Sequence, residues 1–91
     1  MIRSFKHRGL KELFETGRSR RVRTDLQRRA IRRLDTLDSA SELAALNIPG
    51  FDFHRLRGKP ARYSIHINGP FCVTFEWEDG DAIQVDLEQY H

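Results

Sequence analysis

The residues best suited to chemistry lie in the second half of the chain and at its end. His54 and Arg57 are close in sequence, and Tyr90 and His91 finish the chain. Histidine exchanges protons near neutral pH, because its unperturbed pKa is about 6.5. RNA cleavage by the 2′-hydroxyl, without a metal, needs a base for that hydroxyl, cations for the charge on phosphorus and an acid for the leaving 5′-oxygen. Histidine, tyrosine and arginine or lysine cover these three roles.

Each of these residues also has an interpretation in which its role is structural and not catalytic. A lone histidine in a small domain, such as His54, is more often a surface or hydrogen-bonded residue than a catalyst. Tyr90 would equally serve to cap the core, although chain ends usually fray and an aromatic end indicates docking. Carboxylates crowd one turn, where such residues are most often solvated: Glu76, Glu78, Asp79 and Asp81. The sequence therefore predicts no metal site and no cofactor.

Charge is divided unevenly along the chain. Residues 1–34 carry 12 Lys or Arg against 3 acidic residues, a net +9, whereas residues 35–91 carry 4 against 10, a net −6. A half this basic suits a polyanion, because phosphate contacts release counterions and attract over a long range. The alternative by charge alone is a solvated helix face.

Length and composition limit the class of protein. Ninety-one residues are expected to form a single domain, 1–91, with any site on the outside of one small core. Cys72 is the only cysteine, so neither an internal disulfide nor a cysteine zinc site can form. No apolar run reaches the roughly 20 residues of a membrane span, and the first residues lack a secretory signal. The sequence predicts a cytoplasmic protein.

Helical periodicity dominates the first half of the chain. A short strand at 2–5 precedes a helix through Leu10, Leu13 and Phe14, with Gly17 placed to end it. A basic loop over 17–23 leads to a second helix. Its apolar stripe should face the core: Leu26, Ala30, Leu34 and Leu37. Four arginines are expected to project to the other side: Arg28, Arg29, Arg32 and Arg33.

Two capping-box spacings suggest where helices begin. Thr24 is followed three residues later by Gln27, and Ser39 by Glu42. The second pair opens a short turn or helix, which Pro49-Gly50 stops.

From residue 51 onward apolar residues recur with a period of two. Turn sequences at 68–70 and 78–81 predict a hairpin over 62–77 that continues antiparallel through 82–87. The apolar face of this sheet should pack against the helices: Ile65, Ile67, Val73, Phe75, Ile83, Val85 and Leu87. The other face is left for polar side chains, His66 among them. The expected fold class is α+β.

Several short motifs, in this order and at this spacing, resemble a known family. They are Met1-Ile2-x-Ser4-Phe5, Gly9-Leu10, Leu13-Phe14-Glu15-x-Gly17, His54-x-Leu56-Arg57-Gly58, Ser64-Ile65-x-Ile67-Asn68, Gly80-Asp81-Ala82 and Tyr90-His91. Together they resemble the HigB branch, the plasmid maintenance killer proteins, of the RelE/ParE toxin superfamily. The resemblance runs from one end of the chain to the other.

This resemblance implies a RelE-like fold and an activity. Such toxins of type II toxin–antitoxin systems cleave mRNA in the A site of the 30S ribosomal subunit by 2′-hydroxyl attack, leaving a 2′,3′-cyclic phosphate and inhibiting translation. A helix-turn-helix antitoxin of the HigA kind neutralises them, and operator DNA is bound only through the antitoxin. His54 and His91 would be the acid–base pair, Arg57 would hold the scissile phosphate, and Tyr90 would stack on or orient a nucleotide.

Further binding residues are candidates beside these four. Lys59 and Arg62 are weaker phosphate candidates suggested by proximity alone, and His66 is either an extra catalytic group or a harmless replacement. The basic first half would grip ribosomal RNA through Arg18, Arg20, Arg21, Arg23, Arg28, Arg29, Arg32 and Arg33.

The chain departs from the family pattern at three positions. Many relatives carry arginine at the position of Cys72, where it reaches the phosphate, and arginine at the position of His66. Aspartate is common before the final Tyr-His, where this chain has Gln89. Loss of one stabilising cation commonly lowers a rate by on the order of 10²–10³. The alternative function is therefore a weakened or non-catalytic module that binds the ribosome or the antitoxin.

A DNA-binding regulator that uses the arginine-rich second helix fits the sequence less well. Those arginines lack the Asn/Gln pattern that reads bases and the preceding helix-turn signal.

Overall fold

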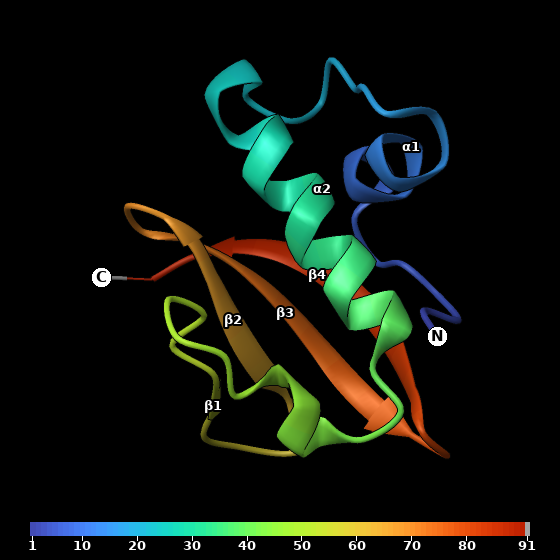
Figure 1. Cartoon of the computed structure of the whole chain (residues 1–91), viewed down its shortest axis with the longest axis vertical. Coiled ribbons are helices and arrows are strands. Elements are labelled where there is room, and N and C mark those ends of the chain that lie inside the picture. Colours follow the sequence, from blue (N-terminus) through green and yellow to red (C-terminus); the bar gives the residue numbers. More distant parts are fainter. Residues whose placement is uncertain (91) are drawn as a thin grey trace.

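Two helices lie on one face of a four-stranded sheet in the computed structural model, which describes residues 1–90 (Figure 1). Along the chain the elements are α1 (Arg8–Thr16), α2 (Thr24–Ser39), the 3₁₀ helix η1 (Leu43–Leu46), β1 (His54–Arg55), β2 (Tyr63–Asn68), β3 (Phe71–Glu78) and β4 (Asp81–Gln89). The expected α+β class is confirmed, as is the order of the two helices, the short helix and the antiparallel strands after residue 8.

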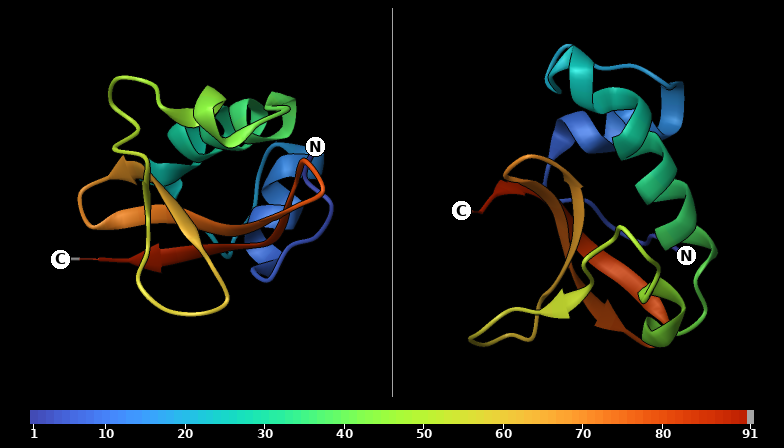
Figure 2. Two further views of the ribbon diagram at one scale, coloured as in Figure 1. Left: turned by 90° about the horizontal axis from the view of Figure 1, so that it is seen from below. Right: turned by 60° about the vertical axis from the view of Figure 1, so that its left-hand side comes forward.

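The sheet has the strand order β1-β2-β3-β4, and every neighbouring pair is antiparallel. Both helices cover the same side of the sheet, and the other side is left uncovered (Figure 2). Of the residues predicted to carry chemistry, His54 lies on that open side, and Arg57 and Tyr90 line a hollow at its edge.

The first residues run alongside β4 but do not form the strand expected at 2–5. They make two isolated parallel bridges, Ile2 with Ala82 and Phe5 with Val85. Between these bridges, β4 contains an extra residue, Gln84, whose backbone N–H donates to the Ser4 hydroxyl at 2.9 Å. The irregular edge prevents a continuous ladder.

α1 begins and ends at recognisable caps. The ring Nδ1 of His7 accepts a hydrogen bond from the N–H of Leu10 at 3.1 Å. Gly17 takes the left-handed conformation, φ 87°, and donates its N–H to the carbonyl of Leu13. The predicted end of this helix is confirmed, because glycine adopts that conformation without steric cost.

The predicted capping box at the start of α2 is wrong. Arg23 is the N-cap and provides no side-chain hydrogen bond. The Gln27 side chain instead donates to the carbonyls of Ser19 and Val22, at 2.7 and 2.9 Å. Because the preceding loop folds back over this turn, Gln27 is used to hold the loop.

The second predicted capping box is also wrong, although the short helix predicted after it is present. Ser39 is the last residue of α2, and its hydroxyl donates to the carbonyl of Asp35 at 3.0 Å. Glu42 is the N-cap of η1 and provides no side-chain cap.

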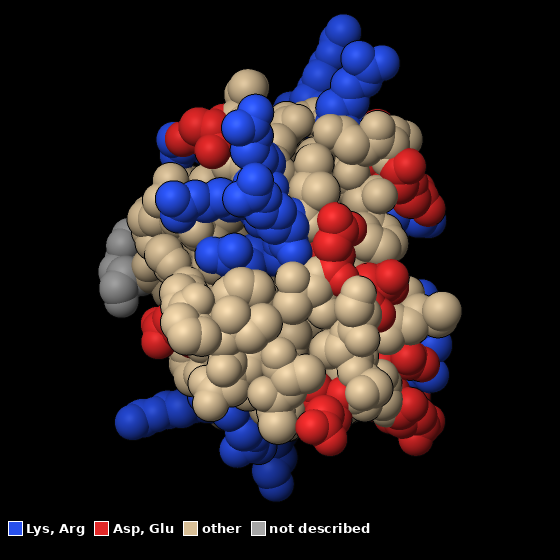
Figure 3. Space-filling model, in the orientation of Figure 1, with Lys and Arg blue, Asp and Glu red and all other residues tan. Residues whose placement is uncertain are grey.

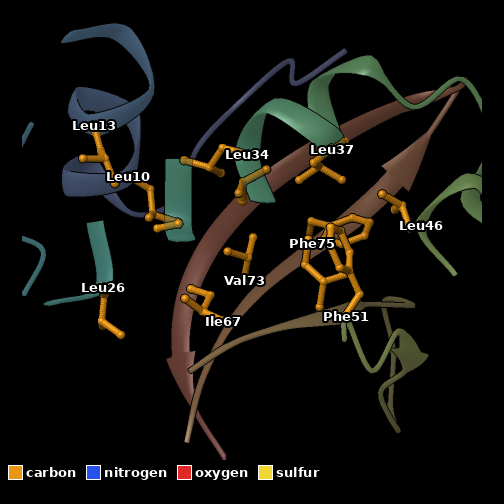
Figure 4. Packing of buried hydrophobic residues seen from close by; sticks show 14 of the residues in the cluster. Leu10, Leu13, Leu26, Leu34, Leu37, Leu46, Phe51, Ile67, Val73 and Phe75 are labelled. Carbon is orange, nitrogen blue, oxygen red and sulfur yellow. The ribbon is translucent and has the colours of Figure 1, made fainter. Parts of the chain in front are cut away.

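The core lies between the helices and the inner face of the sheet (Figure 4). The predicted stripe of α2 is fully buried, as are the central inner-face residues of the sheet: Leu26, Ala30, Leu34, Leu37, Ile65, Ile67, Val73, Phe75 and Val85. Leu87 is partly buried against this cluster.

Ile83 does not lie on the apolar face, contrary to the prediction. It pairs with Glu76, whereas Ala82 pairs with Trp77 and is fully buried. The reason is the extra residue at Gln84, with φ 50°, where the register of β3 and β4 shifts. One inserted residue reverses the faces of the residues that precede it.

Candidate active site

The open face of the sheet carries rows of polar residues in register. One row joins His66, Cys72 and Glu88 across β2, β3 and β4. Directly opposite residues of antiparallel strands project to the same face, so these three side chains are neighbours. A second row contains His54, Ser64, Thr74 and Asp86.

A hollow of about 430 Å³ lies at one edge of this face. Its lining comes from the first residues, the loop after β1 and the end of β4: Lys6, Leu56, Arg57, Gly58, Lys59, Pro60, Arg62, Glu88 and Tyr90. Four residues predicted from the sequence are therefore brought together: Arg57, Lys59, Arg62 and Tyr90.

Arg57 and Lys59 are exposed on the loop between β1 and β2. Neither forms an ion pair with any residue between 1 and 90. Their charges are thus available to an anionic ligand in the hollow, where an unpaired cation attracts phosphate.

Arg62 is engaged with the sheet instead. Its guanidinium donates to a carboxylate oxygen of Glu76, the hydroxyl of Thr74 and the carbonyl of Gln84, each at 3.0 Å. The Arg62–Glu76 ion pair is mostly buried, with 20% and 24% of the two side chains exposed. Arg62 therefore joins β3 to β4 across the open face, and its predicted contact with phosphate stays a prediction.

Tyr90 is held by a carboxylate. Its phenol donates a hydrogen bond to Oε2 of Glu88 at 3.4 Å, and the Thr74 hydroxyl donates to the same oxygen. Burial raises the pKa of Tyr90, as do the negative charge and the hydrogen bond of Glu88. A raised pKa keeps the phenol of Tyr90 protonated at neutral pH, so that it can donate a hydrogen bond.

His54 lies on the same face but does not line the hollow. Its Nδ1 is 2.8 Å from the carbonyl of Asp52. A carbonyl only accepts, so Nδ1 carries a hydrogen, and in the neutral ring the lone pair that a proton acceptor needs is on Nε2. His91 lies outside the described residues, so its predicted pairing with His54 stays a prediction.

His66 and Cys72 are adjacent in register on the open face. Nε2 of His66 is hydrogen-bonded to the carbonyl of Gly69 at 2.9 Å, which ties the ring to the hairpin turn. Cys72 is buried, with 8% of its surface exposed. The position where an arginine was expected from the family pattern is therefore occupied by a small, neutral side chain.

Sequence reasoning missed Lys6, Thr74 and Glu88. The alternation of apolar and polar residues in the last two strands would have placed Thr74 and Glu88 on the open face. Lys6 is far away in sequence, and only the pairing of the first residues with β4 brings it to the hollow.

The comparison with known proteins gives the family. A model for "HigB-like toxin: RelE-like toxin of type II toxin-antitoxin system HigB" matches residues 3–91, nearly the whole chain. The chain belongs to the HigB-like toxins. Its two helices against an antiparallel sheet agree with the fold expected of RelE-like toxins.

Two relatives of this HigB-like chain match over their full length or nearly so. Endoribonuclease HigB of Proteus vulgaris is 39% identical over 92 residues, which cover 100% of both chains. Toxin HigB-1 of Vibrio cholerae is 30% identical over 93 residues, covering 99% of this chain and 98% of the relative.

The basic half of this HigB-like toxin surrounds a second hollow, of about 960 Å³, between the end of α1 and the start of α2. Four predicted RNA-binding residues line it: Arg18, Arg20, Arg21 and Arg23. Arg23 is paired with Asp25 at 2.7 Å and lies over the ring of Phe71, 5.1 Å from its centre. Arg18, Arg20 and Arg21 form no ion pair with a described residue.

Basic side chains also gather over α2 (Figure 3). Arg28 and Arg32 are exposed, as expected. Arg29 is exposed as well, although its guanidinium donates to the carbonyl of Ile67 at 3.4 Å. Arg33 corrects the prediction, because it reaches back to β2 and donates to the carbonyl of His66 at 2.8 Å.

Arg33 is the more embedded of these two arginines. It lies over the ring of Phe51, 4.2 Å from its centre. Burial lowers the pKa of Arg33, and the charges of Arg29 and Arg32 add to the effect.

Among residues 1–90 the structure contains no group of three or more His, Cys, Asp or Glu able to hold a metal ion. No helix in the same range is both long enough and apolar enough to cross a bilayer.

Proposed function

We propose that this HigB-like toxin is an endoribonuclease that cleaves mRNA in the A site of the 30S ribosomal subunit and thereby inhibits translation and growth. The observation that carries the proposal is the convergence of Arg57, Lys59 and the Tyr90 phenol on one hollow. The Proteus vulgaris relative, an endoribonuclease by name, supports the same activity.

The proposed reaction is attack of the ribose 2′-oxygen on the adjacent phosphorus. A base accepts the 2′-hydroxyl proton, the new O–P bond forms, and the bond from phosphorus to the 5′-oxygen breaks. An acid gives its proton to that oxygen, leaving a 2′,3′-cyclic phosphate and a 5′-hydroxyl. His54 and His91 are the proposed acid–base pair, and Nε2 of His54 is the atom suited to accept the proton.

Arg57 is the proposed contact to the scissile phosphate, and Lys59 is a second cation beside it. Positive charge held at the phosphate stabilises the negative charge that develops there in the transition state. The protonated phenol of Tyr90 is proposed to orient a nucleotide at the same place, supported by its contact with Glu88.

The arginines around the second hollow and on α2 are the proposed contacts to ribosomal RNA. They suit this role because their guanidinium groups line a different hollow from the candidate active site or lie on α2, and guanidinium groups bind phosphate in a salt-dependent way.

A type II toxin has an antitoxin partner, as the family implies. The proposed antitoxin is a helix-turn-helix protein of the HigA kind. It binds operator DNA, and the toxin is held at the operator only through the antitoxin. A ribosomal substrate implies that the toxin acts in the cytoplasm.

Primer extension on mRNA incubated with programmed ribosomes and the purified chain tests the activity. We expect a cut within the A-site codon that depends on the ribosome and leaves a 2′,3′-cyclic phosphate. Intact mRNA at every concentration that saturates the ribosome would overturn the proposal.

Cys72 supports a second candidate function, a weakened or non-catalytic module that binds the ribosome or the antitoxin. This buried neutral residue stands where the family pattern has a phosphate-binding arginine. Undegraded mRNA together with a salt-sensitive ribosome complex would favour this module. Recovery of cleavage in Cys72→Arg would then identify the missing cation as the cause.

A further inference from the structure

The backbone around Lys6 is fixed against β4. The N–H of Lys6 donates to the carbonyl of Val85 at 2.8 Å, and the N–H of His7 donates to the same oxygen at 3.1 Å. The first turn of α1 follows directly, and His7 is its N-cap. Lys6 is therefore presented from a rigid position, although it lies close to the start of the chain.

Its side chain points to the open face. Phe5, the preceding residue, pairs with the buried Val85 and packs against the core. Lys6 itself lies at a bend, where its exposed side chain lines the hollow together with Arg57, Lys59 and Tyr90.

The ammonium group of Lys6 has no carboxylate within ion-pair distance among residues 1–90. Glu88, the carboxylate in the lining of the hollow, accepts hydrogen bonds from the hydroxyls of Thr74 and Tyr90. Arg62, the neighbouring cation, is paired with Glu76. The ammonium group of Lys6 therefore has no paired carboxylate among residues 1–90 and can bind a phosphate of the proposed substrate.

From this placement we propose that Lys6 is a phosphate-binding residue of the hollow, which contacts the RNA backbone and supplies positive charge that the neutral Cys72 does not. The inference rests on the proposed function for the identity of the ligand. It assigns the first residues of the chain a part in binding substrate, in addition to their structural contact with β4.

Three variants separate charge from structure. Lys6→Gln removes the charge and keeps the backbone N–H, whereas Lys6→Arg retains the charge. Lys11→Gln is the matched control, because Lys11 is an exposed lysine of α1 that lines a different hollow. Equal melting temperatures for all three would show that the fold is intact.

The first measurement is the single-turnover cleavage rate on programmed ribosomes at saturating toxin. Lys6→Gln is expected to lower the rate by on the order of 10²-fold, with Lys6→Arg close to the parent and Lys11→Gln unchanged. A parent rate in Lys6→Gln would overturn the inference and leave the proposed function standing.

The second measurement does not depend on cleavage. A short 2′-O-methyl RNA, which cannot be cut, is titrated into the isolated chain at several salt concentrations. Lys6→Gln is expected to bind the RNA more weakly. The slope of log affinity against log salt concentration should be smaller in magnitude by about one, whereas Lys11→Gln should match the parent. Binding that depends on Lys6 without any cleavage by the parent would support Lys6 and refute the nuclease. Binding unaffected by Lys6→Gln would refute the role of Lys6 in either case.

Discussion

The phenol of Tyr90 and the hydroxyl of Thr74 donate hydrogen bonds to the same oxygen of Glu88. Thr74 in turn accepts from Arg62, so one chain of hydrogen bonds runs from the β1–β2 connection through the centre of the open face to the end of β4. The side chain of Tyr90, the penultimate residue, is thereby connected to the interior of the sheet. This connection accounts for an ordered aromatic residue where a chain end would otherwise fray.

Glu88→Gln should lower the pKa of Tyr90. The variant removes a negative charge that favours the neutral phenol, while burial, the largest cause of the raised pKa, remains. Titration of tyrosinate absorbance would show one phenol ionising at lower pH than in the parent, and Tyr90→Phe identifies which of the two tyrosines it is. An unchanged titration curve would show that Glu88 does not act on Tyr90.

Arg62→Met should destabilise the fold by about 1–3 kcal/mol, because Glu76 loses its partner in a mostly buried position. Urea denaturation measures this change. The double variant Arg62→Met/Glu76→Met should recover part of the loss, because no unpaired carboxylate remains. Equal stability of Arg62→Met and the parent would indicate that Arg62 is free to bind phosphate.

The bulge at Gln84 predicts unequal effects of two truncations in β4. Val85→Ala should cost about 2 kcal/mol, since Val85 is fully buried. Ile83→Ala should cost less than about 1 kcal/mol, because the bulge turns Ile83 to the open face. Larger destabilisation by Ile83→Ala than by Val85→Ala would mean that the register is the regular one read from the sequence.

Neutralising the basic loop should weaken ribosome binding without slowing the cut itself. The triple variant Arg18→Gln, Arg20→Gln, Arg21→Gln is expected to dissociate from the ribosome at a lower salt concentration than the parent. At saturating concentration its single-turnover cleavage rate should equal that of the parent. A slow rate at saturation would instead place these arginines in the cleavage step.

The sequence predicted most elements of the fold because their signals are local. Apolar spacing located both helices and the antiparallel strands, and Gly17 marked the end of α1. The first predicted capping box is wrong because Gln27 donates to a loop that folds back on it. The second is wrong because Ser39 is the last residue of α2 and donates to the carbonyl of Asp35. The predicted face of Ile83 is wrong because the alternation of apolar and polar residues does not reveal the bulge in β4.

The candidate site was only partly predictable for the same reason. Arg57 and Tyr90 were recognised by residue type and family resemblance and Lys59 by its proximity to Arg57, and the structure brings the three together. Lys6 enters the hollow through a long-range pairing, and the engagement of Arg62 depends on three partners from two strands. Neither relationship can be read from spacing along the chain.

The most direct test of the site compares two arginines that are two residues apart. Arg57 lines the hollow, whereas Arg55 lies in β1, exposed and outside the lining. In single-turnover cleavage of mRNA on programmed ribosomes, Arg57→Gln should be slower than the parent by on the order of 10²–10³, and Arg55→Gln should cleave at the parent rate. Equal rates for the two variants would contradict the assignment of this hollow as the place where RNA is cut.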